Sequence, residues 1–171
     1  EHYSDRSSKS NEEWAKPLLD ETAKMVGVED VNPTYVEVSF SNVCNLKCAY
    51  CSPAFSSSWM EEIQSQGPYP TSDKFNNLPW LKQQGKLPIP HREHNPYVDA
   101  FWKWFPDLYK TLQVFRITGG EPLLAKDTFK VLDYVKNNPR PDLELSINSN
   151  GCVPDKLFDQ YIEKMKRITL D

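Results

Sequence analysis

The segment that decides the fold is residues 112–148, LQVFRITGGEPLLAKDTFKVLDYVKNNPRPDLELSIN. Residues 112–118 and 143–148 alternate apolar with polar side chains, which predicts two strands. Residues 127–137 between them predict a helix, and residues 154–166 predict another. The apolar stripe of this second helix is Leu157, Phe158, Tyr161, Ile162 and Met165. Strands that alternate with helices in this way predict an α/β fold with a parallel sheet and right-handed crossovers.

Two further strands are expected on either side of this segment. Residues 35–40, YVEVSF, are rich in aromatic and β-branched side chains and follow Pro33, which favours a first strand. A last strand is expected to begin at Arg167. Four parallel strands are too few to close a barrel of six or eight, so we expect a partial (β/α) barrel whose later strands lie outside this segment.

Helices are also expected before and after the first strand. Residues 10–26 carry a helical apolar pattern, with Pro17 in the first turn or breaking the helix. Residues 57–66 predict a helix because Ser58 and Glu61 have the spacing of a capping box and Gly67 follows. We therefore interpret residues 1–33 as a helical lead-in and residues 34–171 as the core domain.

Residues 67–96 carry six of the fourteen prolines and no clear periodicity, which predicts a long ordered loop or insertion. An aromatic patch follows this segment, and its helical spacing favours a packed core face over a substrate-stacking surface. The patch consists of Tyr97, Phe101, Trp102, Trp104, Phe105 and Tyr109.

Composition excludes several classes of function. The chain has 171 residues and a net charge of −4, and it lacks the basic footprint of a nucleic-acid-binding domain. No apolar run approaches the roughly 18 residues that a membrane span needs. The first residues are polar and lack an initiating Met or a signal peptide, so we expect an internal segment of a longer, non-exported chain, with neither nucleic acid nor membrane as a partner.

Three of the four cysteines lie within eight positions, with the spacing C-x3-C-x2-C at Cys44, Cys48 and Cys51. Clustered thiols indicate a metal site and a reducing, cytoplasmic environment. Three thiolates suit a four-iron cluster with one open iron, because structural zinc sites are usually closed by four ligands. The alternatives are a zinc site completed by Cys152, His91 or His94, and three unrelated buried thiols.

Two turns follow the later strands. Thr118-Gly119-Gly120-Glu121-Pro122 pairs glycines, which permit close approach of a ligand, with a carboxylate that can receive an ammonium group. Residues 148–151, Asn-Ser-Asn-Gly, offer amide and hydroxyl groups. Each alone could be a plain turn. The carboxyl ends of parallel strands share one rim, however, so we expect both turns and the cysteines to converge on one ligand.

These residues resemble the radical S-adenosylmethionine (SAM) enzymes, whose signature is C-x3-C-x-aromatic-C followed by a Gly-Gly-Glu-Pro strand end. Here the signature is Cys44-Asn-Leu-Lys-Cys48-Ala-Tyr50-Cys51 with residues 119–122, and the resemblance covers about residues 35–171. The run SFSNVCNLKCAYCSPAFSSSW, with LPW at residues 78–80, is most similar to the twitch-domain subgroup. The 68 residues from Cys51 to Gly119 exceed a minimal core of this family, which agrees with an insertion.

The resemblance implies a TIM-like barrel and a set of roles. The three cysteines would hold a 4Fe-4S cluster whose open iron binds the amino and carboxylate groups of SAM. Gly119, Gly120 and Glu121 would meet the methionine amino group, and the backbone around Tyr50 would meet the adenine. The ribose or carboxylate would lie against Asn148, Ser149 and Asn150.

The same resemblance implies reductive cleavage of SAM to a 5'-deoxyadenosyl radical that abstracts hydrogen from an unidentified substrate. An electron donor such as flavodoxin or ferredoxin would be a partner. The substrate could be a peptide, a saccharide or another envelope metabolite. The alternatives are a small-molecule enzyme of the deazapurine synthase or glycyl-radical activase type, and a non-catalytic zinc-binding module.

Overall fold

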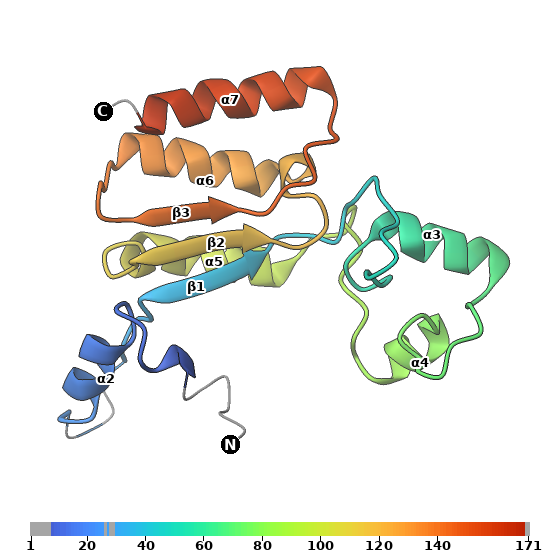
Figure 1. Cartoon of the computed structure of the whole chain (residues 1–171), viewed down its shortest axis with the longest axis horizontal. Helices are drawn as coiled ribbons and strands as arrows, with labels where there is room; N and C mark the ends of the chain where they lie inside the picture. Colours follow the sequence, from blue (N-terminus) through green and yellow to red (C-terminus); the bar gives the residue numbers. More distant parts are fainter. Residues whose placement is uncertain (1–7, 26, 28–29, 170–171) are drawn as a thin grey trace.

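The computed structural model describes residues 8–25, 27 and 30–169, which form a parallel three-stranded sheet in the order β1-β2-β3 (Figure 1). The strands are β1 (Tyr35–Ser39), β2 (Val114–Thr118) and β3 (Glu144–Ile147). Two helices follow β2 and β3, namely α6 (Lys126–Asn137) and α7 (Asp155–Thr169). The predicted α/β alternation and parallel pairing are therefore confirmed.

The prediction of a fourth strand from Arg167 is wrong, because α7 continues through this position to Thr169. Ile168 lies three residues after Met165 and packs with it against Leu123, Phe129 and Leu132. This spacing places Ile168 on the apolar face of the helix, and tertiary packing there overrides the strand preference of a β-branched residue. Residues 170–171 lie outside the described part of the chain.

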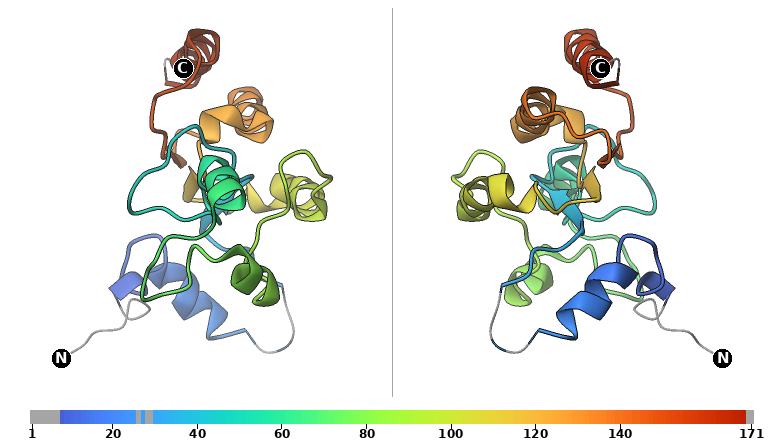
Figure 2. Two further views of the ribbon diagram at one scale, coloured as in Figure 1. Left: turned by 90° about the vertical axis from the view of Figure 1, so that its right-hand side faces the viewer. Right: turned by 90° about the vertical axis from the view of Figure 1, so that its left-hand side faces the viewer.

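One face of the sheet is apolar and carries the core. Phe115 and Ile117 of β2 are fully buried under Phe105 and Leu108 of α5 (Pro96–Leu108) and Val131 of α6. The two helices lie on the same side of the strands in Figure 2. The opposite face is polar: Glu37, Arg116 and Ser146 lie beside one another in the strand register. This division follows directly from the period of two in each strand.

The aromatic patch is only partly core. Phe105 and Tyr109 are buried, as predicted, and Phe101 and Trp102 pack against them. Tyr97 is 76% exposed and Trp104 40% exposed, which contradicts the prediction for these two residues. Trp104 points away from the core because it lies about 100° around the helix from Phe105. Its Nε1–H donates to Asn32 Oδ1 at 2.8 Å.

The segment between β1 and β2 holds α3 (Ser57–Gln66), α4 (Leu78–Gln83) and α5. The bounds of α3 are as predicted, but its cap is Ser56, whose Oγ accepts from the Trp59 N–H, and not Ser58. The Pro-rich residues 67–96 are ordered, and they include α4, which begins after the cap Asn77. Figure 1 shows α3 and α4 beyond the carboxyl ends of the strands.

The lead-in helix is shorter than predicted. It is α2 (Lys16–Thr22), with Pro17 in its first turn. Ahead of it, Trp14 stacks on Tyr35 with 4.9 Å between ring centroids, which attaches this region to β1. Val26 lies outside the described residues, and the division into two regions at residue 33 stays a prediction. Within the described ranges no helix has the length and apolar character that a bilayer crossing requires.

Candidate active site

The three clustered cysteines lie in the loop that leaves β1, at the carboxyl end of the sheet. Each thiol is half-buried, and the Cys51 N–H donates to the Cys48 carbonyl at 2.9 Å. Burial raises the pKa of the Cys51 thiol; a backbone hydrogen bond at Ser52 opposes this, and the charges of Cys44 and Cys48 raise it further. Burial and the neighbouring thiolate charges thus act in the same direction on the pKa of the Cys51 thiol.

The start of α3 holds the cysteine loop in place. Ser58 Oγ donates to the Cys44 carbonyl at 2.7 Å, and Ser56 Oγ donates to the Leu46 carbonyl at the same distance. Ser57 Oγ accepts from the Cys44 N–H at 3.1 Å. These contacts satisfy backbone groups that a loop would otherwise expose. Sequence reasoning missed them, although three consecutive serines at a helix start were an available signal.

Trp59 reaches the loop from the next position of α3. Its Nε1–H donates to the Cys48 carbonyl at 3.0 Å, and its ring packs edge-on against Tyr69 of the Pro-rich segment, 5.3 Å between centroids. Glu62 joins the same parts, since its carboxylate pairs with Lys47 and accepts from Tyr69 OH. The cysteine loop, α3 and the Pro-rich segment are thus one connected unit.

The paired glycines after β2 lie against the cysteine loop. A Cβ on Gly120 would lie 2.7 Å from the carbonyl carbons of Asn42 and Val43, and nearer still to the Val43 oxygen. A Cβ on Gly119, which has a positive φ of 112°, would lie 2.9 Å from the Ser41 oxygen. In this structure the two glycines admit the backbone that leads to Cys44, and their contact with a ligand stays a prediction. Only glycine fits at either position.

Glu121 is a buried connection between two turns. The side chain is 1% exposed, and Oε1 accepts from the Leu123 N–H at 3.0 Å and from Ser149 Oγ at 2.7 Å. Oε2 accepts from the Asn150 N–H at 2.7 Å. The carboxylate is therefore engaged within the protein, and its predicted contact with an ammonium group stays a prediction.

Residues 148–150 complete the site from the end of β3. The Asn148 N–H donates to the Ile117 carbonyl at 3.0 Å, which extends the sheet. Asn150 Nδ2 lies 3.1 Å from Asn45 Oδ1 and 3.9 Å from Cys44 Sγ. The three turns that follow the three strands therefore meet at one rim, as the parallel topology predicts.

Cys152 also lies near the cysteine loop, which its distance in sequence did not indicate. Its carbonyl accepts from Asn45 Nδ2, its N–H donates to Asn150 Oδ1 at 2.7 Å, and its thiol is exposed. His94 is engaged elsewhere, with Nε2 2.6 Å from Asp99 Oδ2. Tyr50 is 93% exposed, and a hydrogen bond to Cys48 raises the pKa of its phenol.

The donor set fits an iron–sulfur cluster. Among the described residues, no three His, Cys, Asp or Glu side chains converge closely enough to hold a single metal ion. A four-iron cluster does not need such convergence, because each thiolate binds a different iron. Three half-buried thiols on one loop, with its carbonyls held by neighbouring side chains, match that requirement. Cys44, Cys48 and Cys51 are the residues that would hold the cluster.

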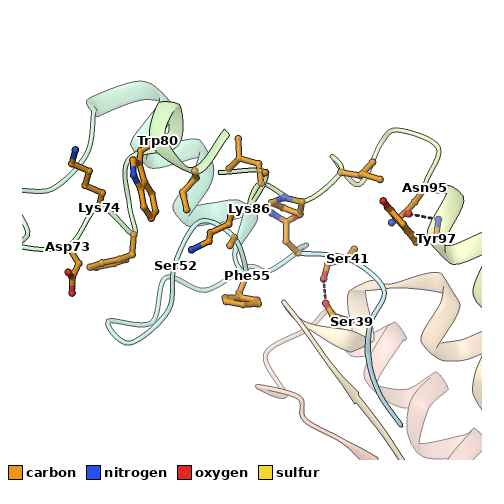
Figure 3. Close-up of a pocket in the computed structure, with 18 of the residues that line it drawn as sticks. Ser39, Ser41, Ser52, Phe55, Asp73, Lys74, Trp80, Lys86, Asn95 and Tyr97 are labelled. Atoms are coloured by element: carbon orange, nitrogen blue, oxygen red, sulfur yellow. Dashed lines mark hydrogen bonds between the residues drawn. The ribbon is translucent and has the colours of Figure 1, made fainter. Parts of the chain in front are cut away.

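A cleft of about 1030 Å³ lies between the Pro-rich segment and the chain that runs from the end of β1 into the cysteine loop (Figure 3). Ser39, Ser41 and Ser52, from the end of β1 and the cysteine loop, form one side of it. The other side is formed by residues of the Pro-rich segment, which include Asp73, Lys74, Trp80 and Lys86, and by Tyr97. The cleft is large enough for a ligand of drug-like size.

Comparisons with known proteins agree with this arrangement. The family model of the radical SAM superfamily matches residues 38–171. The chain is 27% identical over 132 residues to the GTP 3',8-cyclase of Nautilia profundicola, covering 77% of this chain and 31% of the relative. It is 28% identical over 136 residues to the GTP 3',8-cyclase of Mycobacterium ulcerans, covering 79% and 28%. The chain thus spans about a third of the length of these curated relatives, and no solved structure matches it.

Proposed function

Because this chain belongs to the radical SAM superfamily, we propose that it binds a 4Fe-4S cluster on Cys44, Cys48 and Cys51 and cleaves SAM reductively. The observation that carries the proposal is the meeting of three turns at one rim: the cysteine loop, Gly119–Gly120–Glu121 and residues 148–150. Each turn alone has an ordinary structural explanation. Their joint contact through Glu121 and Asn150 favours a common ligand.

The protein's part in this chemistry is to bind, orient and exclude water. The three thiolates would hold three of the four irons, and the remaining iron would be open to the amino and carboxylate groups of SAM. A reduced cluster held by Cys44, Cys48 and Cys51 would supply the single electron for reductive cleavage of SAM to methionine and a 5'-deoxyadenosyl radical, the species that would abstract a hydrogen atom from the substrate. A flavodoxin or ferredoxin is the proposed source of that electron.

The remaining rim residues are proposed to hold SAM. The backbone at Gly119–Gly120–Glu121 receives the methionine amino group, and Glu121 fixes the shape of this turn through its bonds to Leu123 and Asn150. The backbone around Tyr50 receives the adenine. Asn148, Ser149 and Asn150 face the ribose or the carboxylate. Hydrogen bonds of this kind, aimed at a charged group, contribute about 1.5–3 kcal/mol each.

The subgroup and substrate are further parts of the proposal. The run from Ser39 to Trp59, with residues 78–80, supports the twitch-domain subgroup. The similarity to GTP 3',8-cyclases supports the alternative of a radical SAM enzyme that acts on a small molecule. Because that similarity covers about a third of each relative, we carry over the cofactor chemistry and not the substrate.

Anaerobic purification tests the proposal. We expect a brown protein with about four iron and four sulfide per chain, which releases 5'-deoxyadenosine from SAM in the presence of a low-potential reductant. Cys44→Ala, Cys48→Ala and Cys51→Ala should each lose the iron. Cys152→Ala is the matched control, since it removes a nearby thiol and should keep the iron. A colourless protein with one zinc would instead support the zinc module.

A further inference from the structure

The cleft beside the cysteine loop is separate from the rim residues that are proposed to hold the cluster and SAM. None of the three clustered cysteines and none of the residues 119–121 or 148–150 lines it. Ser52 nevertheless does, and it follows Cys51 directly. A ligand in this cleft would therefore be a neighbour of the cluster loop without displacing SAM.

The cleft exposes large aromatic side chains that the fold does not require. Phe55 is 58% exposed, Phe75 43% and Tyr97 76%, and Trp80 joins them in the lining. Leaving such groups in water is unfavourable by about 25 cal/mol for each Å² of apolar surface. Exposed aromatic side chains gathered around one hollow indicate a surface that binds a flat or apolar group.

The charge of the cleft is opposite to that of the chain. Its charged lining residues are Lys74, Lys86 and Asp73, in a protein whose net charge is −4. Lys86 Nζ lies 5.1 Å from the centroid of the Trp80 ring, and no carboxylate of the described residues forms an ion pair with it. Figure 3 shows Lys86 directed between Trp80 and Phe55, with Asp73 at the outer end. Lys86 is therefore a cation beside the Trp80 ring, with no ion-pair partner among the described residues.

We propose that this cleft is the substrate site and that it selects an aromatic group bearing an anionic substituent. Trp80 and Phe55 contact the flat group, and Lys86 binds the anion, which is a phosphate or a carboxylate. The hydroxyls of Ser41 and Ser52 lie on the opposite side, where they can bond to polar atoms of the same molecule. The proposal rests on the proposed function, since it assigns the substrate class of that enzyme.

A pair of dyes tests the site without knowledge of the substrate. 8-Anilinonaphthalene-1-sulfonate is an aromatic anion that fluoresces on burial, and N-phenyl-1-naphthylamine has the same rings without the charge. Titrated into the iron-reconstituted full chain, the anionic dye should bind more tightly than the neutral dye. Lys86→Met should weaken the anionic dye at least fivefold and leave the neutral dye unchanged. Trp80→Leu should weaken both.

Lys82→Met is the matched control, because Lys82 is an exposed lysine of α4 that does not line the cleft. Equal dye affinities in the Lys82→Met and Lys86→Met variants would overturn the proposal, as would equal binding of the two dyes. Thermal melts of each variant exclude unfolding as the cause of a change. Iron content and SAM cleavage are measured on the same samples, so loss of the cluster chemistry with intact dye binding would count against the proposed function alone.

Competition then assigns the anionic group. Displacement of the sulfonate dye by GTP would identify the group as a phosphate, and displacement by N-acetyltryptophan would identify it as a carboxylate. Either result supports the proposal. Displacement by neither compound at millimolar concentration would show that the cleft accepts the dye but not these two biological anions, and it would overturn the assignment of substrate class.

Discussion

Replacing Gly120 by alanine should disturb the cysteine loop although the residue is remote from Cys44 in sequence. The new methyl group would lie 2.7 Å from the carbonyl carbons of Asn42 and Val43, so these carbons must move by about 0.7 Å to reach the 3.4 Å of ordinary contact, and the nearer Val43 oxygen must move further. Overpacking of this kind costs about 1–3 kcal/mol. The shift also breaks the bond from the Glu121 N–H to the Val43 oxygen, at 2.6 Å, which contributes about 1 kcal/mol.

We therefore expect Gly120→Ala to lower the free energy of unfolding by about 2–4 kcal/mol, measured by urea denaturation of the reduced apoprotein. Iron bound after anaerobic reconstitution should fall in parallel. Gly85→Ala is the control, because Gly85 has a positive φ of 62° but no atom within 4 Å of an added Cβ. It should cost about 1–2 kcal/mol and retain the iron. A Gly120→Ala protein with the stability and iron content of Gly85→Ala would refute the close approach.

Three further substitutions test individual side chains. Trp59→Phe removes the donor to the Cys48 carbonyl and should cost about 1 kcal/mol of stability, with faster loss of iron to a chelator followed by absorbance. Glu121→Ala leaves three donors without an acceptor and should weaken SAM binding by about 1–3 kcal/mol while iron stays bound. If calorimetry finds unchanged SAM affinity, the role of this turn is purely structural. Burial raises the pKa of Tyr109, whose OH donates to the Asn138 carbonyl. The stabilising effect of the neutral phenol is therefore complete below about pH 10 and is lost as pH rises through the higher folded-state pKa. The free energy of unfolding of Tyr109→Phe should fall less steeply above about pH 10 than that of the unsubstituted protein.

The parts of the fold that could be predicted are those governed by short-range periodicity. Alternation along residues 112–118 and 143–148 identified β2 and β3, because each has one apolar and one polar face. The end of α7 could not be predicted in the same way. Ile168 and Thr169 are β-branched and favour a strand locally, but Ile168 packs against the cluster of Leu123, Phe129 and Leu132. That contact depends on the tertiary arrangement of α6 and α7.

The candidate site, like the fold, could be predicted only in part. Parallel strands bring their carboxyl ends together, so the meeting of the cysteine loop with residues 119–121 and 148–150 followed from topology. Topology did not predict which side chains connect these turns. Glu121 has the residue type of a ligand-binding carboxylate, and only the positions of Ser149 and Asn150 show that its oxygens bond within the protein. Asn45 and Cys152 are likewise neighbours through loop conformation alone.

The attachment of the cysteine loop to α3 bears on how the enzyme would survive oxygen. Hydrogen bonds from Ser56, Ser58 and Trp59 fix the carbonyls of Leu46, Cys44 and Cys48, and all of them come from the protein itself. The conformational entropy lost in ordering this loop is therefore offset largely by protein folding and not by metal binding. Oxidative damage to the cluster would then leave a folded, repairable chain, and cellular iron–sulfur assembly could reload it without new protein synthesis.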